Sequence, residues 1–367
     1  MKVLITGADG FIAQNLIKRL RQDEHHEVLT FDRSNTIDDL FSLTNNADIV
    51  FHLAGVNRPK NENEFFLGNT QLTEDLCNAL SDTKRKIPLI FSSSTQAILD
   101  NPYGQSKLSA EEVIHTYGKT TRSKVFIYRL TNVFGKWSRP NYNSVVSTFC
   151  YNIANDLPIC VDDPDKPLSL VYIDDVVGEF LRIIDNKADK SAEINPVYDI
   201  KLGELAELIK SFDENRAQSL VGGVGQGLTR ALYATYLSYF ETSKFSYKLD
   251  LHIDERGGFS EFLKTKHSGQ VSFFTINPGH IRGGHYHHTK NEKFLVIKGS
   301  AKFRFRNILT NEKYEKDVKD DLLEVVETIP GWVHDISNSS DEVTIVMLWA
   351  NEIFDKDQPD TYTSSLD

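Results

Sequence analysis

The feature that most constrains the fold is a glycine-rich turn near the start of the chain, TGADGFIA at residues 6–13. It directly follows the apolar residues 3–5 and leads into an amphipathic stretch at residues 14–22, so it joins a strand to a helix. Gly7 permits the tight turn, and Gly10 lets the backbone approach a pyrophosphate at the helix N-terminus. The turn predicts a dinucleotide-binding βαβ unit, and the alternative is a glycine turn in another α/β fold. The residues expected to contact the cofactor here are Gly7, Gly10, Phe11 and Ile12.

The first half of the chain alternates short β-branched runs with amphipathic segments, and the last third does not. Strands that alternate with helices imply a parallel sheet, which predicts a Rossmann-type, doubly wound α/β domain over residues 1–245. From about residue 250, strand-like runs are separated by Gly, Asn and Asp turns, which predicts an all-β barrel or sandwich over residues 246–367. The strands predicted for the first domain are residues 3–6, 27–31, 49–53, 89–92 and 124–129.

Composition narrows the classes of function. The net charge of −11 argues against a nucleic-acid binder, because there is no basic surplus to neutralise phosphates. No apolar run approaches the roughly 20 residues that a membrane helix needs, so membrane insertion is not expected. Cys77, Cys150 and Cys160 are scattered and odd in number, which is typical of reduced thiols. We therefore expect a cytoplasmic protein.

The end of the second predicted strand indicates which nicotinamide cofactor is used. Asp32 follows this strand, and an acidic residue here usually binds the ribose 2′-hydroxyl of NAD. Arg33 comes next, and an arginine here accommodates the 2′-phosphate of NADP. With both present, the sequence favours NADPH through Arg33, and the alternative is that Arg33 is merely solvated.

A second motif in the first domain is typical of a carbonyl reductase. Tyr103 and Lys107 are spaced i and i+4, so on a helix they share a face. A neighbouring ammonium favours the ionised form of a tyrosine and is expected to lower its pKa toward neutrality. The serines 92–94 precede this pair, and a serine hydroxyl can hold the substrate carbonyl. The pattern predicts hydride transfer to carbon with a proton passing from Tyr103 to oxygen.

Together these motifs resemble the extended short-chain dehydrogenase/reductase family, which acts largely on nucleotide sugars. The matching segments span most of the first 180 residues in family order: TGADGFIA (6–13), HLAG (52–55), LGNT (67–70), FSSST (91–95), YGQSK (103–107), RLTNVFG (129–135) and YIDDV (172–176). The resemblance implies that Ser94 supplies the catalytic hydroxyl, with Tyr103 and Lys107 as its partners. It further implies cofactor contacts from Leu53, Ala54, Gly55, Tyr103 and Lys107, and substrate contacts from Asn69 and Asn132.

Two departures from that family affect the expected chemistry. The gap between Ser94 and Tyr103 is shorter than is usual, so the active-site loop is expected to be trimmed. The related dehydratases carry an Asp-Glu pair beside the catalytic hydroxyl, whereas Thr95 and Gln96 stand there in this chain. Because elimination needs a general acid and base at that place, a dehydratase is disfavoured.

The second domain contains a set of residues with metal-ligand spacing. His285 and His287 alternate on a strand and so share a face, and Glu292 follows a turn that can return it to the same place. His334 follows later, in the segment PGWVHDISN at residues 330–338. Three histidines and one carboxylate suit a divalent metal such as Zn, Fe, Mn or Ni. The spacing matches both motifs of the cupin (jelly-roll) barrel, and the alternative is a metal-free barrel with acid–base or structural histidines.

A further resemblance in this domain is to the deoxysugar epimerases of the cupin superfamily, carried by DERGGFSEF (254–262) and IRGGHY (281–286). These enzymes invert carbons beside a 4-keto group and usually carry no metal. The resemblance implies that His285 is a catalytic base, a role that competes with metal ligation. It also implies that Arg256, Glu261 and Arg282 hold the nucleotide or sugar, the alternative being a solvated strand edge.

A reductase fused ahead of a cupin resembles capsular polysaccharide enzymes of the CapF type. The resemblance implies a bifunctional enzyme whose cupin domain epimerises C3 of a UDP-linked 2-acetamido-4-keto-2,6-dideoxyhexose and whose first domain reduces the C4 ketone with NADPH. The implied product is UDP-N-acetyl-6-deoxy-L-talosamine, on the route to N-acetyl-L-fucosamine. Zinc and a homodimer are implied as well. The alternative is a reductase of a 4-keto nucleotide sugar whose cupin only binds sugar or forms the dimer.

Overall fold

The computed structural model describes residues 1–185 and 192–366, which form two compact units. The first unit combines Met1–Lys210 with Gly225–Phe240, and the second combines Ser211–Val224 with the chain from Glu241 onward. The predicted division assigned residues 211–224 to the first domain. They group with the second unit because β9 (Leu220–Val221) forms parallel strand pairs with β11 (Gly257–Thr265).

The first unit is built on a five-stranded sheet in which every pair of neighbours is parallel. The strand order is β2-β1-β3-β4-β5, so the chain reverses its direction of winding on the two sides of β1. Such a switch point places a crevice at the carboxyl ends of the strands, where ligands bind in open α/β sheets. The predicted Rossmann-type fold is confirmed. The strands are β1 (Lys2–Thr6), β2 (Glu27–Phe31), β3 (Ile49–His52), β4 (Leu89–Ser94) and β5 (Val125–Leu130).

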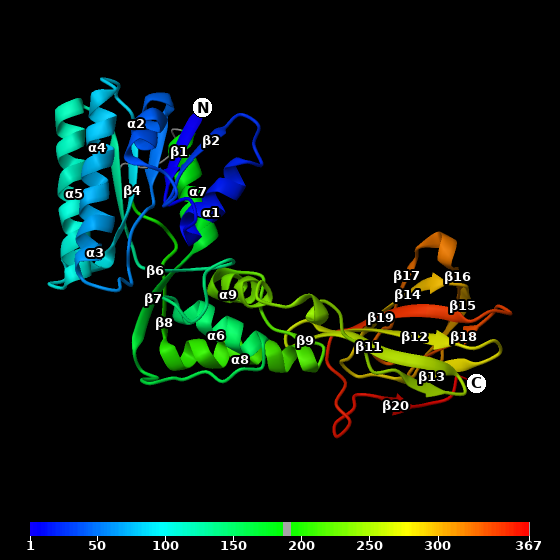
Figure 1. The fold of residues 1–367 in the computed structure, drawn as a ribbon. Coiled ribbons are helices and arrows are strands. Elements are labelled where there is room, and N and C mark those ends of the chain that lie inside the picture. Colours follow the sequence, from blue (N-terminus) through cyan, green and yellow to red (C-terminus); the bar gives the residue numbers. More distant parts are fainter. Residues whose placement is uncertain (186–191, 367) are drawn as a thin grey trace. The chain divides into compact units, whose positions relative to one another are not determined.

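Helices cover both faces of this sheet (Figure 1). On one face α1 (Phe11–Leu20) packs on α7 (Ile173–Ile184), and on the other α4 (Leu72–Asp82) packs between α2 (Ile37–Asn46) and α5 (Pro102–Thr121). The core between α2, α4, α5 and the sheet consists mainly of buried Leu, Ile, Val, Phe and Ala side chains. The sheet and its helices therefore hold the loops at the strand ends on a rigid base.

The remaining elements belong to the first unit, except that α8 passes into the second unit from Ser211 onward. A three-stranded sheet has the order β6-β7-β8. A short α3 and a π-helix, η1, precede α4, and a 3₁₀ turn, η2, follows β4. The bounds are β6 (Asn132–Phe134), β7 (Pro167–Tyr172), β8 (Tyr198–Lys201), α3 (Asn63–Phe65), η1 (Phe66–Gln71), η2 (Thr95–Ile98), α6 (Val145–Ala154), α8 (Leu202–Ala217) and α9 (Gly227–Leu237).

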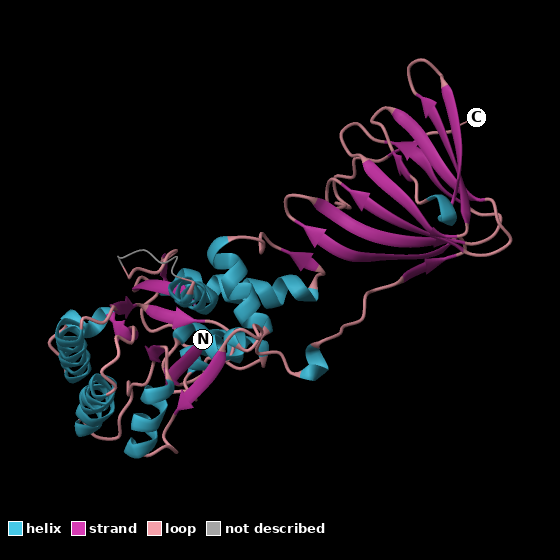
Figure 2. Ribbon diagram, turned by 90° about the horizontal axis from the view of Figure 1, so that it is seen from above, coloured by secondary structure: helices cyan, strands magenta, loops and turns pink. Residues whose placement is uncertain are grey.

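The second unit consists almost entirely of antiparallel strands arranged as two sheets (Figure 2). One sheet has the order β10-β11-β12-β19-β14-β17, with β9 added on β11, and the other has the order β16-β15-β18-β13-β20. Burial alternates along the strands, as in β15, because successive side chains point to opposite faces. Buried side chains from both sheets, such as Phe274, Phe303 and Val346, form one core. The predicted β-barrel domain is confirmed.

Besides β9, the second unit contains the strands β10 to β20, numbered along the chain; β10 is a short edge strand. A 3₁₀ turn, η3 (Thr242–Lys244), precedes them, and another, η4 (Asp320–Leu322), follows β16. The bounds are β10 (His252–Asp254), β11 (Gly257–Thr265), β12 (Gly269–Ile276), β13 (Ile281–Tyr286), β14 (Glu292–Lys298), β15 (Ser300–Asn307), β16 (Lys313–Lys319), β17 (Val325–Glu327), β18 (Trp332–Asn338), β19 (Thr344–Ala350) and β20 (Tyr362–Thr363).

Candidate functional site

The glycine turn of the first unit brings the ends of β1 and β3 into contact. Gly7 has φ +68°, and a Cβ there would lie 2.6 Å from the Cα of Ala54, so only glycine fits. The Ala54 amide donates a hydrogen bond to the Thr6 hydroxyl at 3.3 Å, which fixes the loop containing Leu53 and Gly55. Gly10 is the N-cap of α1 and provides no side-chain cap. No side chain caps the first amides of the helix, so they are available to a pyrophosphate.

The two residues predicted to recognise the cofactor ribose, Asp32 and Arg33, have different surroundings. Asp32 accepts hydrogen bonds from the Ser34 hydroxyl at 2.6 Å and the Ser34 amide at 2.8 Å, which lower the pKa of its carboxyl. Both bonds use the same carboxylate oxygen. The side chain of Arg33 is exposed. The turn after β2 thus presents both an ionised carboxylate and a guanidinium.

The structure brings Ser94, Tyr103 and Lys107 together. Ser94 is the last residue of β4, and its hydroxyl is close enough to the Tyr103 phenol to act on the pKa of that group. Lys107 lies one turn further along α5 and is only 5% exposed. Its ammonium donates to the Ser92 carbonyl at 3.0 Å and lies 4.7 Å from the centre of the Phe91 ring. The serine, the tyrosine and the lysine therefore lie around the end of β4.

Burial determines the pKa values of Tyr103 and Lys107. The result for Tyr103 differs from the prediction made from the sequence. Burial raises the pKa of Tyr103, and the nearby Ser94 hydroxyl offsets this only in part. Burial also lowers the pKa of Lys107 to about 8, opposed by the negative charge of Glu111. The expected fall in the tyrosine pKa does not occur because desolvation of the phenolate is the larger effect. Tyr103 is therefore a protonated group at neutral pH.

The short loop between Ser94 and Tyr103 packs directly on α5. Its residues Thr95–Ile98 form the 3₁₀ turn η2, with Ser94 as the N-cap. At Gly104 a Cβ would lie 2.3 Å from the Gln96 carbonyl oxygen and 2.5 Å from that of Leu99. The glycine between Tyr103 and Lys107 is therefore what allows the trimmed loop and the catalytic helix to meet.

The two predicted substrate-binding asparagines have different surroundings. Asn69 lies in the π-helix η1, is 2% exposed, and bonds both the amide and the carbonyl of Val56 and the hydroxyl of Ser106. These contacts favour a role in positioning the loop after β3 over the predicted substrate contact. Asn132 is exposed, with its amide donating to the Ser169 carbonyl at 3.0 Å. It remains a candidate for contact with substrate.

One residue that the sequence interpretation missed, His52, bonds the residue that precedes the glycine turn. His52 is fully buried, and its two ring nitrogens bond the hydroxyls of Thr6 at 2.7 Å and Thr73 at 2.8 Å. Burial, with the nearby charge of Lys107, lowers the pKa of His52 to about 3, so the ring is neutral. Its position at the start of the HLAG segment was the available signal.

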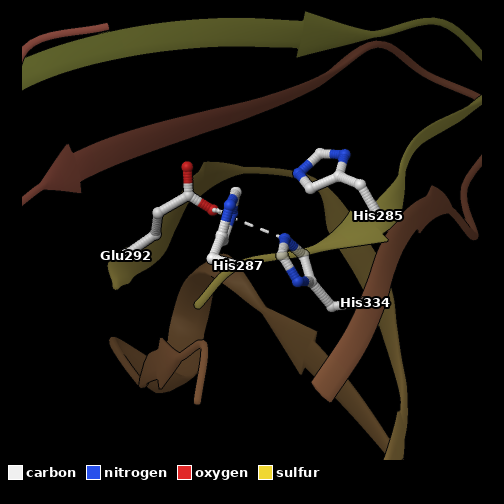
Figure 3. A group of neighbouring side chains, drawn as sticks. All are labelled: His285, His287, Glu292 and His334. Atoms are coloured by element: carbon white, nitrogen blue, oxygen red, sulfur yellow. Dashed lines mark hydrogen bonds and ion pairs between the residues drawn. The ribbon is translucent and has the colours of Figure 1, made fainter. Parts of the chain in front are cut away.

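In the second unit, the four predicted metal ligands converge from three places in the chain (Figure 3). His285 is on β13 and His287 follows it, while Glu292 begins β14 and His334 lies on β18. Their nitrogen and oxygen atoms all lie within 4.8 Å of one another. The Glu292 oxygen Oε2 lies 3.3 Å from Nε2 of His287 and 3.4 Å from Nε2 of His334.

The geometry and charge of this cluster fit a divalent cation. Two ligand atoms each about 2.1 Å from a tetrahedral zinc lie roughly 3.4 Å apart, which is the spacing observed around Glu292. Burial opposes ionisation of Glu292, but hydrogen bonds from His287 and His334 hold its pKa well below the usual range. Burial and the two neighbouring histidines lower the pKa of His285 to about 4. The cluster therefore offers a neutral imidazole at His285 and an ionised carboxylate at Glu292.

A buried cation at this cluster was not predicted. Lys290 is 9% exposed, and its ammonium lies 3.2 Å from Oε1 of Glu292, the oxygen that does not face His287 and His334. The salt bridge fixes the rotation of the carboxylate and leaves Oε2 for the histidine side. A lysine inside the short spacing between His287 and Glu292 was the only sequence signal.

The predicted sugar-binding residues of the second unit fall into two groups. Arg256 and Arg282 both approach Asp254, with shortest separations of 2.5 and 3.7 Å. Glu261 pairs instead with Lys264 along β11 at 3.0 Å. Among the described residues, no hydrogen bond or ion pair joins these side chains to the histidine cluster.

No helix within residues 1–185 and 192–366 is both long and apolar enough to cross a membrane.

Comparison with known proteins agrees with this two-part architecture. The NAD dependent epimerase/dehydratase family matches residues 3–200, and the polysaccharide biosynthesis C-terminal domain matches residues 252–362. The chain is 51% identical to a UDP-2-acetamido-2,6-beta-L-arabino-hexul-4-ose reductase of Pseudomonas aeruginosa, over 100% of this chain and 99% of that protein.

Solved structures give the same result. The capsular polysaccharide assembling protein CapF of Staphylococcus aureus superposes with a TM-score of 0.93 at 41% identity, covering all of both chains. A UDP-glucuronic acid 4-epimerase of Bacillus cereus in complex with NAD shares only the fold of the first part, with a TM-score of 0.55, 19% identity, and coverage of 65% of this chain and 98% of that one. The chain therefore belongs to the NAD dependent epimerase/dehydratase family, as a CapF-like member with a polysaccharide biosynthesis C-terminal domain.

Proposed function

We propose that the first unit is an oxidoreductase that reduces the C4 ketone of a UDP-linked 2-acetamido-4-keto-2,6-dideoxyhexose. The observation that carries this proposal is the grouping of the Ser94 and Tyr103 hydroxyls with the buried Lys107 at the end of β4. The Pseudomonas aeruginosa relative, identical at half of all positions, is named a reductase of a UDP-linked hexul-4-ose.

The residues of the first unit would act as follows. Ser94 and Tyr103 would hold the ketone oxygen through their hydroxyl groups. A bound nicotinamide cofactor would supply the hydride for C4. Because burial raises the pKa of Tyr103, the phenol carries its proton at neutral pH and can give it to the oxygen as the alcohol forms. The Lys107 ammonium stabilises the phenolate that remains. Gly7 and Gly10 would admit the cofactor pyrophosphate, and Arg33 would bind the 2′-phosphate that distinguishes NADPH from NADH.

We propose that the second unit binds one zinc ion and epimerises C3 of the same sugar before reduction. His285, His287, Glu292 and His334 would hold the ion, since their donor atoms have the spacing and chemistry that zinc requires. The adjacent ketone makes the C3 proton acidic, and a divalent cation held by these residues would supply positive charge that favours its removal. Arg256 and Arg282 would hold the nucleotide diphosphate. Reduction of the epimerised ketone gives UDP-N-acetyl-6-deoxy-L-talosamine, a precursor of capsular N-acetyl-L-fucosamine.

A second role for His285 is favoured by one observation. Among the described residues, His287 and His334 lie within 3.4 Å of Glu292, and no ion pair joins His285 to it. A ring at the rim of the metal site could act as the base at C3. The variant His285→Ala separates the two roles: a metal ligand loses zinc affinity, whereas a base loses C3 exchange and keeps zinc.

The test of the whole proposal is Tyr103→Phe in the full chain. NADPH oxidation should fall by a factor of about 10²–10⁴, the usual contribution of a positioned acid. Exchange of the C3 proton in D2O should persist, because it needs only the second unit. Loss of both activities would overturn the assignment of two separate sites. If the unaltered chain reduces the ketone without C3 exchange, the second unit only binds sugar or forms a dimer.

A further inference from the structure

The C-terminal tail lies along the strand that carries His285. β20 pairs antiparallel with β13, placing Thr363 opposite His285 and Tyr362 opposite Tyr286. The Ser364 amide extends this contact by donating to the Gly284 carbonyl at 3.0 Å. The other edge of β13 pairs with β18, which carries His334. Without the tail, β13 would be the edge of its sheet and its outer backbone groups would lack these partners.

Asp360, just before β20, caps the loop that joins two of the metal ligands. Its Oδ1 accepts from the amide of His288 at 2.9 Å, and its Oδ2 accepts from the amides of Thr289 at 2.7 Å and Lys290 at 2.8 Å. Oδ2 also accepts from the Thr289 hydroxyl at 2.9 Å. These consecutive residues lie between His287 and Glu292, so one carboxylate holds most of the connection between them.

The backbone of the same residue determines the tautomer of His287. The Asp360 carbonyl oxygen bonds Nδ1 of this ring. A carbonyl can only accept, so Nδ1 carries a proton, and Nε2, which faces Glu292, is the ring nitrogen left to bind a metal. An outer partner of this kind orients a metal-binding histidine and raises its basicity. In contrast, the buried Nδ1 of His334 has no hydrogen-bond partner among the described residues.

The far end of the tail is fastened as well. Arg306 on β15 donates to the Ser365 carbonyl, from Nε at 3.1 Å, and to the Ser364 hydroxyl, from Nη2 at 3.2 Å. Leu366 is buried. The segment from Asp360 to Leu366 is therefore held at its start, middle and end, although it contains only the two residues of β20 as regular structure.

We propose that this segment is a strap that positions the metal site, with Asp360 as the positioning residue. The inference rests on the zinc site proposed for the second unit. In this proposal, the tail holds His287 in one tautomer and holds the loop between His287 and Glu292 in one conformation. Zinc affinity then depends on a side chain that lies about 70 residues beyond the first histidines and does not itself join the ligand cluster.

The test measures zinc binding by competition with a chromophoric chelator, using the full chain and zinc ion alone. Asp360→Ala should raise the zinc dissociation constant by about 10–100-fold, the usual cost of losing an outer partner of a metal ligand. Asp360→Asn keeps an acceptor oxygen and should recover part of this loss. The matched control is Asp357→Ala, an exposed acid on the same tail, which should leave zinc affinity unchanged.

A spectroscopic measurement separates positioning from general loss of structure. The cobalt(II)-loaded Asp360→Ala chain should show a shifted visible absorption band, because the loop between His287 and Glu292 loses the carboxylate that fixes it and the ligands change position. If Asp360→Ala does not fold, the affinity and cobalt spectrum of Asp360→Asn decide the question. Zinc affinity within twofold of the unaltered chain in both variants would overturn the strap alone. Failure of the unaltered chain to bind zinc would overturn the metal site, and the strap with it.

Discussion

The two candidate sites are assembled in opposite ways. In the first unit, Tyr103 and Lys107 are one helical turn apart, and Ser94 comes from the strand that precedes their helix. In the second unit, His285, Glu292 and His334 come from three strands, and the loop between them is capped by Asp360 from the tail. A site built from one βα unit depends on local spacing, whereas a site built across a barrel depends on long-range strand pairing.

The electrostatic states of the two sites differ as well. Burial makes the first site less charged, because it lowers the pKa of Lys107 to about 8 and raises the pKa of Tyr103. The second site keeps its charge despite burial, because His287, His334 and Lys290 hold Glu292 ionised. The first site is thus suited to donate a proton, and the second is suited to receive a cation.

The largest expected effect is a loss of zinc affinity at the second site while the first site stays intact. Glu292→Gln should weaken zinc binding by about 10²–10³-fold, because roughly 10–16 kcal/mol of zinc binding is shared among four ligands. Chelator competition measures this, and Glu312→Gln, on an exposed turn, is the control. Reduction of an already epimerised ketone should be unchanged. A parallel loss of reduction would show that the two sites are not independent.

The next effect tests the buried ammonium of the first site. Folding lowers the pKa of Lys107 from 10.5 to about 8, so the folded chain binds this proton more weakly than the unfolded chain. Stability contributed by the neutral amine is therefore gained as the pH rises through this range. Relative to Lys107→Met, the unfolding free energy of the first unit should increase by about 3 kcal/mol between about pH 7 and 11. Denaturant titration across this range measures the difference, and a flat difference would contradict the lowered pKa.

A smaller effect tests the close packing of the trimmed loop on α5. Gly104→Ala should destabilise the first unit by about 1–3 kcal/mol, since its Cβ would meet two backbone oxygens. Gly178→Ala is the matched control, because a Cβ at this helical position meets no atom within 4 Å. The control should stabilise by roughly 0.5–1 kcal/mol. Melting temperatures of both variants measure the contrast, and equal shifts would refute the packing argument.

The smallest expected effect tests which residue determines the cofactor preference of the first site. Arg33→Ala should raise the KM for NADPH by about tenfold, the low end for a hydrogen bond to a charged group. The KM for NADH should not change, because NADH lacks the 2′-phosphate. Arg21→Ala, an exposed arginine after α1, is the control. Equal effects on both cofactors would assign the preference to a residue other than Arg33.

Features with a fixed local spacing were predictable because local geometry alone determines them. The turn at Gly7 and Gly10, the shared face of Tyr103 and Lys107, and the alternation of His285 and His287 each follow from the repeat of one strand or helix. The parallel sheet and the β-domain followed from the same periodicities. Strand ends were less accurate: the strand predicted to end at residue 92 continues to Ser94.

What only the tertiary structure decided is how these local pieces are surrounded. The carboxylate of Asp360 over the loop after His287, the salt bridge from Lys290 and the grouping of residues 211–224 with the second unit all depend on contacts between distant segments. The raised pKa of Tyr103 depends on burial, which sums over every neighbour. Sequence spacing places a side chain on a face of its own element, but the free energy of its charge depends on what packs against that face.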